Sequence, residues 1–178
     1  MAEVDPGFLE LPMRRMADAA LQRVRDLGAE HADFRLERLR NQDLVLRDGR
    51  VDSASDGQDV GFAVRVVHDG TWGFAAGVDL TPEAAVAVAE RAVEVARVSR
   101  PVNSEPIELA EEPVHADVTW VSPYEVNPFD VPDADKIGLI ADWSERLLAA
   151  DGVDHVQAMV FLVQENKFYA DLAGTITT

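Results

Sequence analysis

The stretch Gly61–Glu83, GFAVRVVHDGTWGFAAGVDLTPE, contains the strongest fold information in this chain of 178 residues. Its apolar residues alternate on both sides of Asp69-Gly70, two residues that tolerate the positive φ angles of a tight hairpin turn. Gly61 and Gly73 mark positions where a side chain would crowd a neighbour or where a strand bulges. The stretch therefore predicts a β-hairpin.

The end of this stretch predicts the start of a helix. Thr81 can cap the helix, Pro82 fits its first turn, and Glu83 lies at the positive end of the helix dipole. We expect this helix to run to about Val98 and to pack closely on a sheet, because it is rich in alanine and valine. Upstream, apolar residues at helical spacing predict another helix from Pro12 to a stop at Gly28.

After the helix that ends at Gly28, apolar and polar residues alternate along the sequence, which predicts antiparallel strands. Asp48-Gly49 is a second hairpin turn signal. We expect strands over His31–Arg40, Asp43–Arg47 and Arg50–Ala54, with a break or bulge at Asp56-Gly57. Together, residues 1–100 predict a helix, four or five antiparallel strands and a helix.

The remainder of the chain predicts two further parts. Residues 101–132 contain six prolines and predict an extended crossing segment, held to the core by Val118, Trp120, Tyr124 and Phe129. Residues 133–178 predict a helix over about Asp133–Ala150 and then a hairpin, with strands Val156–Gln164 and Lys167–Asp171 around a turn at Glu165-Asn166. The fold class expected is α+β, a twisted antiparallel sheet packed against two or three helices and leading into a C-terminal domain outside this chain.

Composition excludes several classes of function. The chain has 33 Asp and Glu against 16 Lys and Arg, a formal net charge of −17, so we expect no nucleic-acid partner. Without cysteine it forms no disulfide and no thiolate metal site. No run reaches the roughly 18 apolar residues of a membrane helix, and the N-terminal residues do not read as a signal peptide, so no membrane partner is expected.

Motifs for chemistry are missing from the sequence. The four histidines are never spaced as a chelating pair, and no nucleophile elbow or phosphate loop occurs. We therefore expect no catalytic, cofactor-binding or metal-binding residue. Three residues remain as candidates for facing a peptide or partner: Arg65, Trp72 and Phe74. Arg65 is either a salt-bridged surface residue or a positive group facing a groove, and the two aromatic residues are either core or a platform for a peptide.

The hairpin residues resemble those of a known family. Gly61–Val66 followed by Asp69–Ala76 is similar to the N-terminal part of TldD proteins in the TldD/PmbA family, as are Ser122–Phe129 and Lys136-Ile137. The resemblance covers essentially the whole chain. It implies a cytoplasmic metallopeptidase system, also associated with modulators of DNA gyrase, that takes unfolded peptide as an extended strand. It also implies a homodimer or a heterodimer with a PmbA-like partner.

The family's His-Glu-x-x-x-His zinc motif has no counterpart in this chain. The resemblance therefore implies an N-terminal domain that contributes dimerisation and substrate-access surfaces and is inactive alone, with zinc bound in the C-terminal part of the parent protein. Two alternatives stay open: a stand-alone module that binds peptides or proteins, and a PmbA-like partner subunit without metal.

Overall fold

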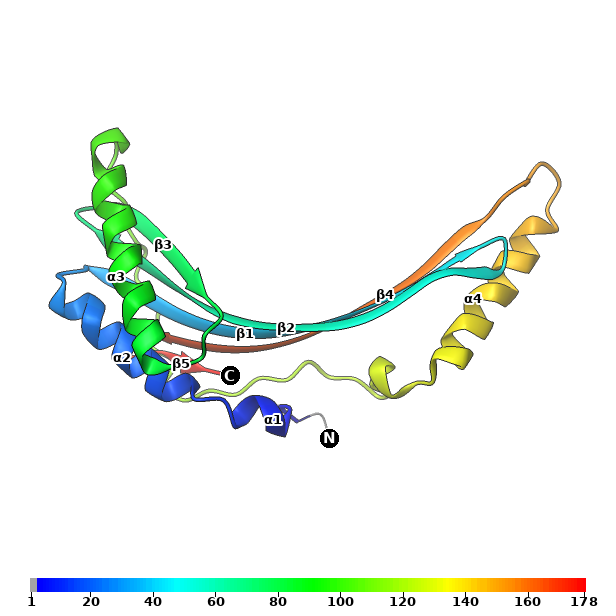
Figure 1. The fold of residues 1–178 in the computed structure, drawn as a ribbon, viewed down its shortest axis with the longest axis horizontal. Coiled ribbons are helices and arrows are strands. Elements are labelled where there is room, and N and C mark those ends of the chain that lie inside the picture. The colour runs from blue at the N-terminus through cyan, green and yellow to red at the C-terminus, as the bar shows by residue number, and fades with distance from the viewer. Residues whose placement is uncertain (1–2) are drawn as a thin grey trace.

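The protein is described by a computed structural model covering residues 3–178. It has an α+β fold with one open antiparallel sheet of five strands in the order β3-β2-β1-β4-β5, which confirms the expected fold class (Figure 1). The strands are β1 His31–Arg47, β2 Arg50–His68, β3 Thr71–Gly77, β4 Gln157–Asp171 and β5 Ile176–Thr177. The helices are α1 Pro6–Leu9, α2 Met13–Asp26, α3 Pro82–Ser99 and α4 Asp133–Leu148, with short 3₁₀ turns η1 Arg100–Val102 and η2 Pro128–Asp130.

The sheet is a long, curved ribbon with its helices on the convex side (Figure 1). Strands β1, β2 and β4 run along the ribbon, whereas β3 and β5 widen only one end of it. Helices α2 and α3 lie at this wide end, and α4 lies at the far end. None of the helices formed by residues 3–178 lies on the concave face.

The apolar core lies between the wide end of the sheet and helices α2 and α3. Its central side chain is Phe34, whose ring lies 5.8 Å from that of Phe62 and 6.4 Å from that of Phe168. Around these rings pack small and medium residues of α2 and α3, including Met16, Val24, Ala89 and Val93. At the far end, α4 buries Ile140 together with the polar side chains of Lys136 and Ser144.

Both predicted hairpin turns are present. Asp48 and Gly49 have φ angles of 51° and 75°, and Asp69 and Gly70 have 49° and 62°. Positive φ at both central residues matches the right-handed twist of the flanking strands. The crowding expected at Gly73 is also confirmed, because a β-carbon there would lie 2.0 Å from the carbonyl oxygen of Ala92 on α3.

The prediction of short, separate strands was wrong. Between residues 3 and 100 the structure has three strands, and β1 runs straight through Asn41-Gln42 where a gap was expected. Strand β2 likewise continues through Asp56-Gly57. Cross-strand pairing overrides the local preference, since Asn41 pairs with Gly57 and Gln42 with Asp56. The irregularity in this ladder lies instead between Val45 and Leu46.

The expected turn at Glu165-Asn166 is also absent. Strand β4 is continuous from Gln157 to Asp171 and pairs with β1 along its whole length. Lys167 supports this register by bridging Glu37 of β1 at 3.2 Å. The chain turns back only after Asp171, to form the two-residue strand β5.

The crossing segment is held by its backbone rather than by the apolar anchors expected. Trp120 is 73% exposed, and Val118 and Tyr124 are exposed as well. Val118 instead exchanges backbone hydrogen bonds with Ile176 and Thr178 beside β5, at 3.0 and 2.9 Å. Of the four expected anchors, Phe129 is half-buried, and the guanidinium of Arg40 lies 4.6 Å from its ring centre.

The two long edges of the ribbon are unpaired over much of their length. Strand β3 pairs with β2 only from Phe62 onward, and β5 pairs with β4 only at Tyr169 and Ala170. Within residues 3–178, no strand therefore pairs with the outer side of β2 over 50–61 or of β4 over 157–168.

The helix cap at Thr81 provides a first prediction. The Thr81 hydroxyl accepts a hydrogen bond from the backbone N–H of Ala84 at 3.1 Å. We expect Thr81→Ala to lower the free energy of unfolding by about 1 kcal/mol, because it leaves that N–H without its capping oxygen. Urea denaturation checks this value. Thr81→Ser keeps the hydroxyl and should stay near wild type, and an equal loss in both variants would contradict the capping role.

Candidate functional site

The concave face of the ribbon presents a row of charged and aromatic side chains at its wide end. Strand pairing places Arg65 opposite both Asp33 and Phe74, and Arg35 opposite Tyr169. These residues alternate along their strands with the core residues that face α2 and α3. The row is therefore the outer side of the most strongly packed part of the sheet.

Asp33 is the centre of this row. Its carboxylate is 1% exposed and accepts hydrogen bonds from Arg35 Nε at 3.0 Å and from Arg65 Nε at 2.8 Å. A terminal nitrogen of Arg65 also lies 2.8 Å away, and His31 Nε2 lies at 3.7 Å. A buried carboxylate needs such partners, because its hydration is lost.

Opposing effects act on the ionisation of Asp33. Burial favours the neutral acid, but the contacts with His31, Arg35 and Arg65 outweigh it and hold the pKa of Asp33 below its ordinary value. Nearby, burial and the charges of Asp33 and Asp171 raise the pKa of the Tyr169 phenol. Tyr169 therefore stays protonated and donates to Asp171 at 3.2 Å.

Both arginines lie against aromatic rings. The guanidinium of Arg65 is 4.6 Å from the Trp72 ring centre, and that of Arg35 is 5.5 Å from the Tyr169 ring centre. Trp72 also meets the edge of His31 at 6.1 Å. These stacks hold the two arginines in place while leaving their side chains 39% and 40% exposed.

The structure brings together all three residues singled out in the sequence, because Arg65 pairs with Phe74 across β2 and β3 and contacts Trp72. Arg65 and Trp72 are in contact, with Arg65 both salt-bridged and open to solvent, and Trp72 half-buried. Phe74 is 58% exposed on the concave face and is not a core residue. Sequence reasoning missed Asp33, Arg35 and Tyr169. The available signal was the alternation of Asp33 and Arg35 with apolar residues, once it is matched to Arg65 across the hairpin.

A groove of about 700 Å³ lies beside the row, over β2 and β3. Arg35 is the basic residue of its lining, and Glu37 and Asp59 are the acidic residues. The other lining residues are apolar or small: Leu39, Val60, Gly61, Phe62, Ala63, Phe74, Ala76, Gly77 and Val78. The concave face thus combines positive groups with an apolar hollow.

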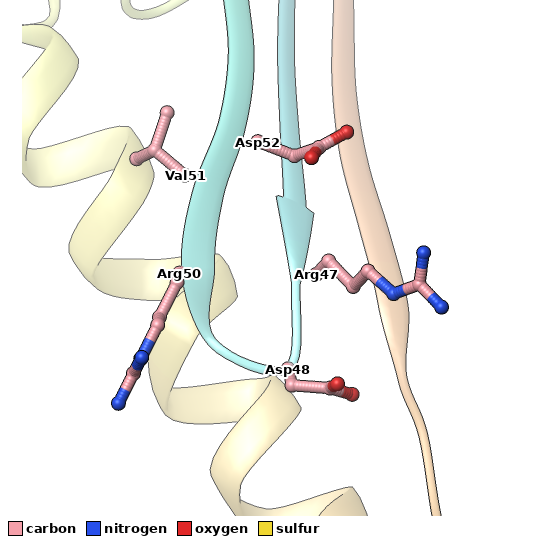
Figure 2. A pocket seen from close by; sticks show the side chains of 5 residues that line it. All are labelled: Arg47, Asp48, Arg50, Val51 and Asp52. Atoms are coloured by element: carbon pink, nitrogen blue, oxygen red, sulfur yellow. The ribbon is translucent and has the colours of Figure 1, made fainter.

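A second hollow, of about 410 Å³, lies at the β1–β2 turn and is a poor candidate for a site. Figure 2 shows that Arg47, Asp48 and Asp52 point to one side of the β1–β2 hairpin and Arg50 and Val51 to the other, rather than toward a shared centre. Asp48 is already occupied, since it accepts the backbone N–H of Val156 at 2.8 Å and contacts His155 at 3.0 Å. It fastens the turn to the start of β4.

Metal-binding groups do not gather in the part of the chain that the structure describes. Residues 3–178 contain no group of three or more His, Asp or Glu side chains placed to hold a metal ion. The family resemblance implies zinc in the C-terminal part of the parent protein, and the side chains of residues 3–178 do not form a set that fits this metal. Over the same residues, no helix combines the length and apolar character required to cross a membrane.

Part of this chain, including the residues that line the groove, matches a known protein family. Residues 32–96, from β1 to α3, match the family described as PmbA/TldA metallopeptidase domain 1. A protein named metalloprotease from Methanothermobacter thermautotrophicus is 28% identical over 147 residues, which cover 83% of this chain and 31% of that protein. The chain spans less than a third of the length of the curated relatives it matches.

Solved structures share the fold. A candidate modulator of DNA gyrase from Thermotoga maritima aligns with a TM-score of 0.67 at 16% identity, covering 92% of this chain and 36% of that one. TldE from Thermococcus kodakarensis aligns with a TM-score of 0.60 at 14% identity, covering 90% of this chain and 36% of that one. Together, the family match over β1 to α3, the metalloprotease relatives and the shared fold support an N-terminal domain that is TldD/PmbA-like.

Proposed function

We propose that this chain is the N-terminal domain of a TldD-like metallopeptidase that hydrolyses unfolded peptides in the cytoplasm. The domain provides a dimerisation surface, toward a second copy or a PmbA-like partner, and a surface that controls the access of peptides. Zinc is held by residues of the parent protein outside this chain, and the chain alone does not hydrolyse peptides.

The observation that supports this proposal most is the uncovered concave face in the region that matches the family. The helices α1 to α4 lie on the opposite side, and the concave face combines the groove with exposed Phe74. Because Phe74 is exposed on a rigid strand, it can contact a peptide without any rearrangement of the core. The sequence prediction that Arg65, Trp72 and Phe74 face a peptide or partner becomes part of this proposal.

The parent protein provides the test. We expect it to cleave a fluorogenic unfolded peptide, to lose activity with a chelator and to regain it with zinc, whereas the 178-residue chain is inactive. In the parent protein, Phe74→Ala should lower kcat/KM about tenfold, equivalent to about 1.4 kcal/mol of transition-state binding. Thermal unfolding should change little, because Phe74 is a surface residue.

Trp120→Ala is the matched control, since it removes an exposed aromatic ring of the crossing segment away from the groove. Equal activity of the Phe74 and Trp120 variants would rule out the groove as a substrate surface. A parent gene without His-Glu-x-x-x-His would instead favour the PmbA-like role, with no metal of its own.

A further inference from the structure

We propose that Arg35 and Arg65 bind the terminal carboxylate of a peptide whose last side chain lies in the neighbouring groove. The proposal rests on the proposed function for the choice of a peptide as ligand, and it adds the direction in which that peptide lies. Its basis is the unused hydrogen-bonding capacity, charge and placement of the two arginines.

The two guanidinium groups have donors to spare. Arg35 uses only Nε on Asp33, and its two terminal nitrogens form no hydrogen bond with any residue between 3 and 178. Arg65 uses Nε and one terminal nitrogen, both on the second oxygen of Asp33. A guanidinium has five N–H donors in a planar fork, so the remaining terminal groups can receive a second carboxylate.

Both guanidinium groups form ion pairs with the same buried carboxylate, so Arg35 and Arg65 share Asp33 as their acidic partner. The acids beside them on β1 and β4 make their hydrogen bonds and ion pairs with other groups: Lys167 bridges Glu37 at 3.2 Å and Glu165 at 2.6 Å, and Asp171 accepts from Tyr169 and from the backbone of Gly174 and Thr175. Within an acidic chain, the arginine pair is thus available to a carboxylate from outside.

Both arginines are also held in advance of binding. Asp33 fixes Nε of each, and the rings of Trp72 and Tyr169 lie against the guanidinium planes. Long side chains normally lose rotamer freedom on binding, and this arrangement removes much of that cost before the ligand arrives.

The groove determines what is attached to the carboxylate. Arg35 is on its lining, next to the apolar side chains of Leu39, Ala63, Phe74 and Ala76. An apolar or aromatic C-terminal residue matches this combination. Farther along β1, Leu39 pairs with Asp59, whose carboxylate disfavours a second negative group on the ligand. A peptide with one terminal carboxylate, an apolar last side chain and no further negative charge matches the arginines, the apolar lining and Asp59.

The test compares two forms of one probe on the 178-residue chain. Acetyl-Ala-Ala-Phe is used with a free carboxylate or as the C-terminal amide, with binding measured by isothermal titration calorimetry. We expect the amide to bind about tenfold more weakly or worse, because a charge-assisted pair is lost. Arg35→Ala should remove the difference between the two forms. Arg35→Lys should restore only part of it, since lysine lacks the planar fork.

Arg47→Ala is the matched control, because Arg47 lies on the same strand and the same face but outside the groove. It should keep the preference for the free acid, and circular dichroism should show every variant folded. Equal binding of acid and amide would overturn carboxylate recognition while leaving peptide hydrolysis by the parent protein intact. Binding of octanoate as tight as that of the peptide acid would overturn the assignment to a peptide.

Discussion

Gly73→Ala is expected to destabilise the chain by about 3 kcal/mol, although it adds a single methyl group. The new carbon would lie 2.0 Å from the carbonyl oxygen of Ala92 and 2.8 Å from the backbone nitrogen of Ala96. Both atoms belong to the backbone of α3, so no side-chain rotation can make room. Helix α3 would have to move away from β3 and lose packing in the core.

Chemical denaturation of the variant and the wild type measures this effect. Gly57→Ala is the matched control, because it lies in β2, where an added carbon meets nothing within 4 Å. The control should stay within about 0.5 kcal/mol of wild type, as surface substitutions do. Similar stability of the two variants would show that α3 does not pack directly against Gly73.

Asp33→Asn is the second change with a large expected effect, a loss of about 3 kcal/mol at neutral pH. The amide preserves shape but removes the charge that holds Arg35 and Arg65. It also places an NH₂ donor where one arginine already donates. The arginines are partly exposed and can rehydrate, which keeps the loss at the low end of the range for buried ion pairs.

The pH dependence of the free energy of unfolding distinguishes the contribution of the Asp33 charge from that of its shape. Because the folded-state pKa of Asp33 is lowered, its contribution to stability is complete above the ordinary aspartate pKa. That contribution is lost as pH falls through the folded-state pKa. Wild type and Asp33→Asn should therefore differ strongly at pH 7 and converge in acid, as followed by urea denaturation over a pH series.

Asp142→Asn serves as the control, since Asp142 forms an exposed ion pair with Arg146 at 2.8 Å. Its loss should cost about 0.5 kcal/mol or less at any pH. If the difference in stability between wild type and Asp33→Asn does not depend on pH, the effect comes from packing and not from charge.

Local features of this fold could be predicted from the sequence, and features set by pairing could not. The Asp-Gly turns and the Thr81 cap follow from a few adjacent residues, and the structure has both turns and the cap. The continuity of β1 through Asn41-Gln42 depends on partners supplied by β2 and β4. No local propensity contains that information.

The same distinction applies to the candidate site. Arg65 and Trp72 stand out within one hairpin, so the sequence draws attention to them. Asp33 becomes the centre only when the β1–β2 register places it opposite Arg65. Tyr169 joins through β4, more than 130 residues later in the chain. A site assembled across four strands requires the register, which composition and spacing do not provide.

The unpaired edges of the ribbon carry different risks of aggregation. The free part of β2 contains Asp52, Asp56 and Asp59, and such charges oppose edge-to-edge association of sheets. The free part of β4 begins with Gln157–Gln164, QAMVFLVQ, which has no charge, proline or glycine. Uncharged segments of high β propensity favour cross-β stacking. Misassembly of this domain would therefore start at β4, and a partner that covers this strand would also act as its protection.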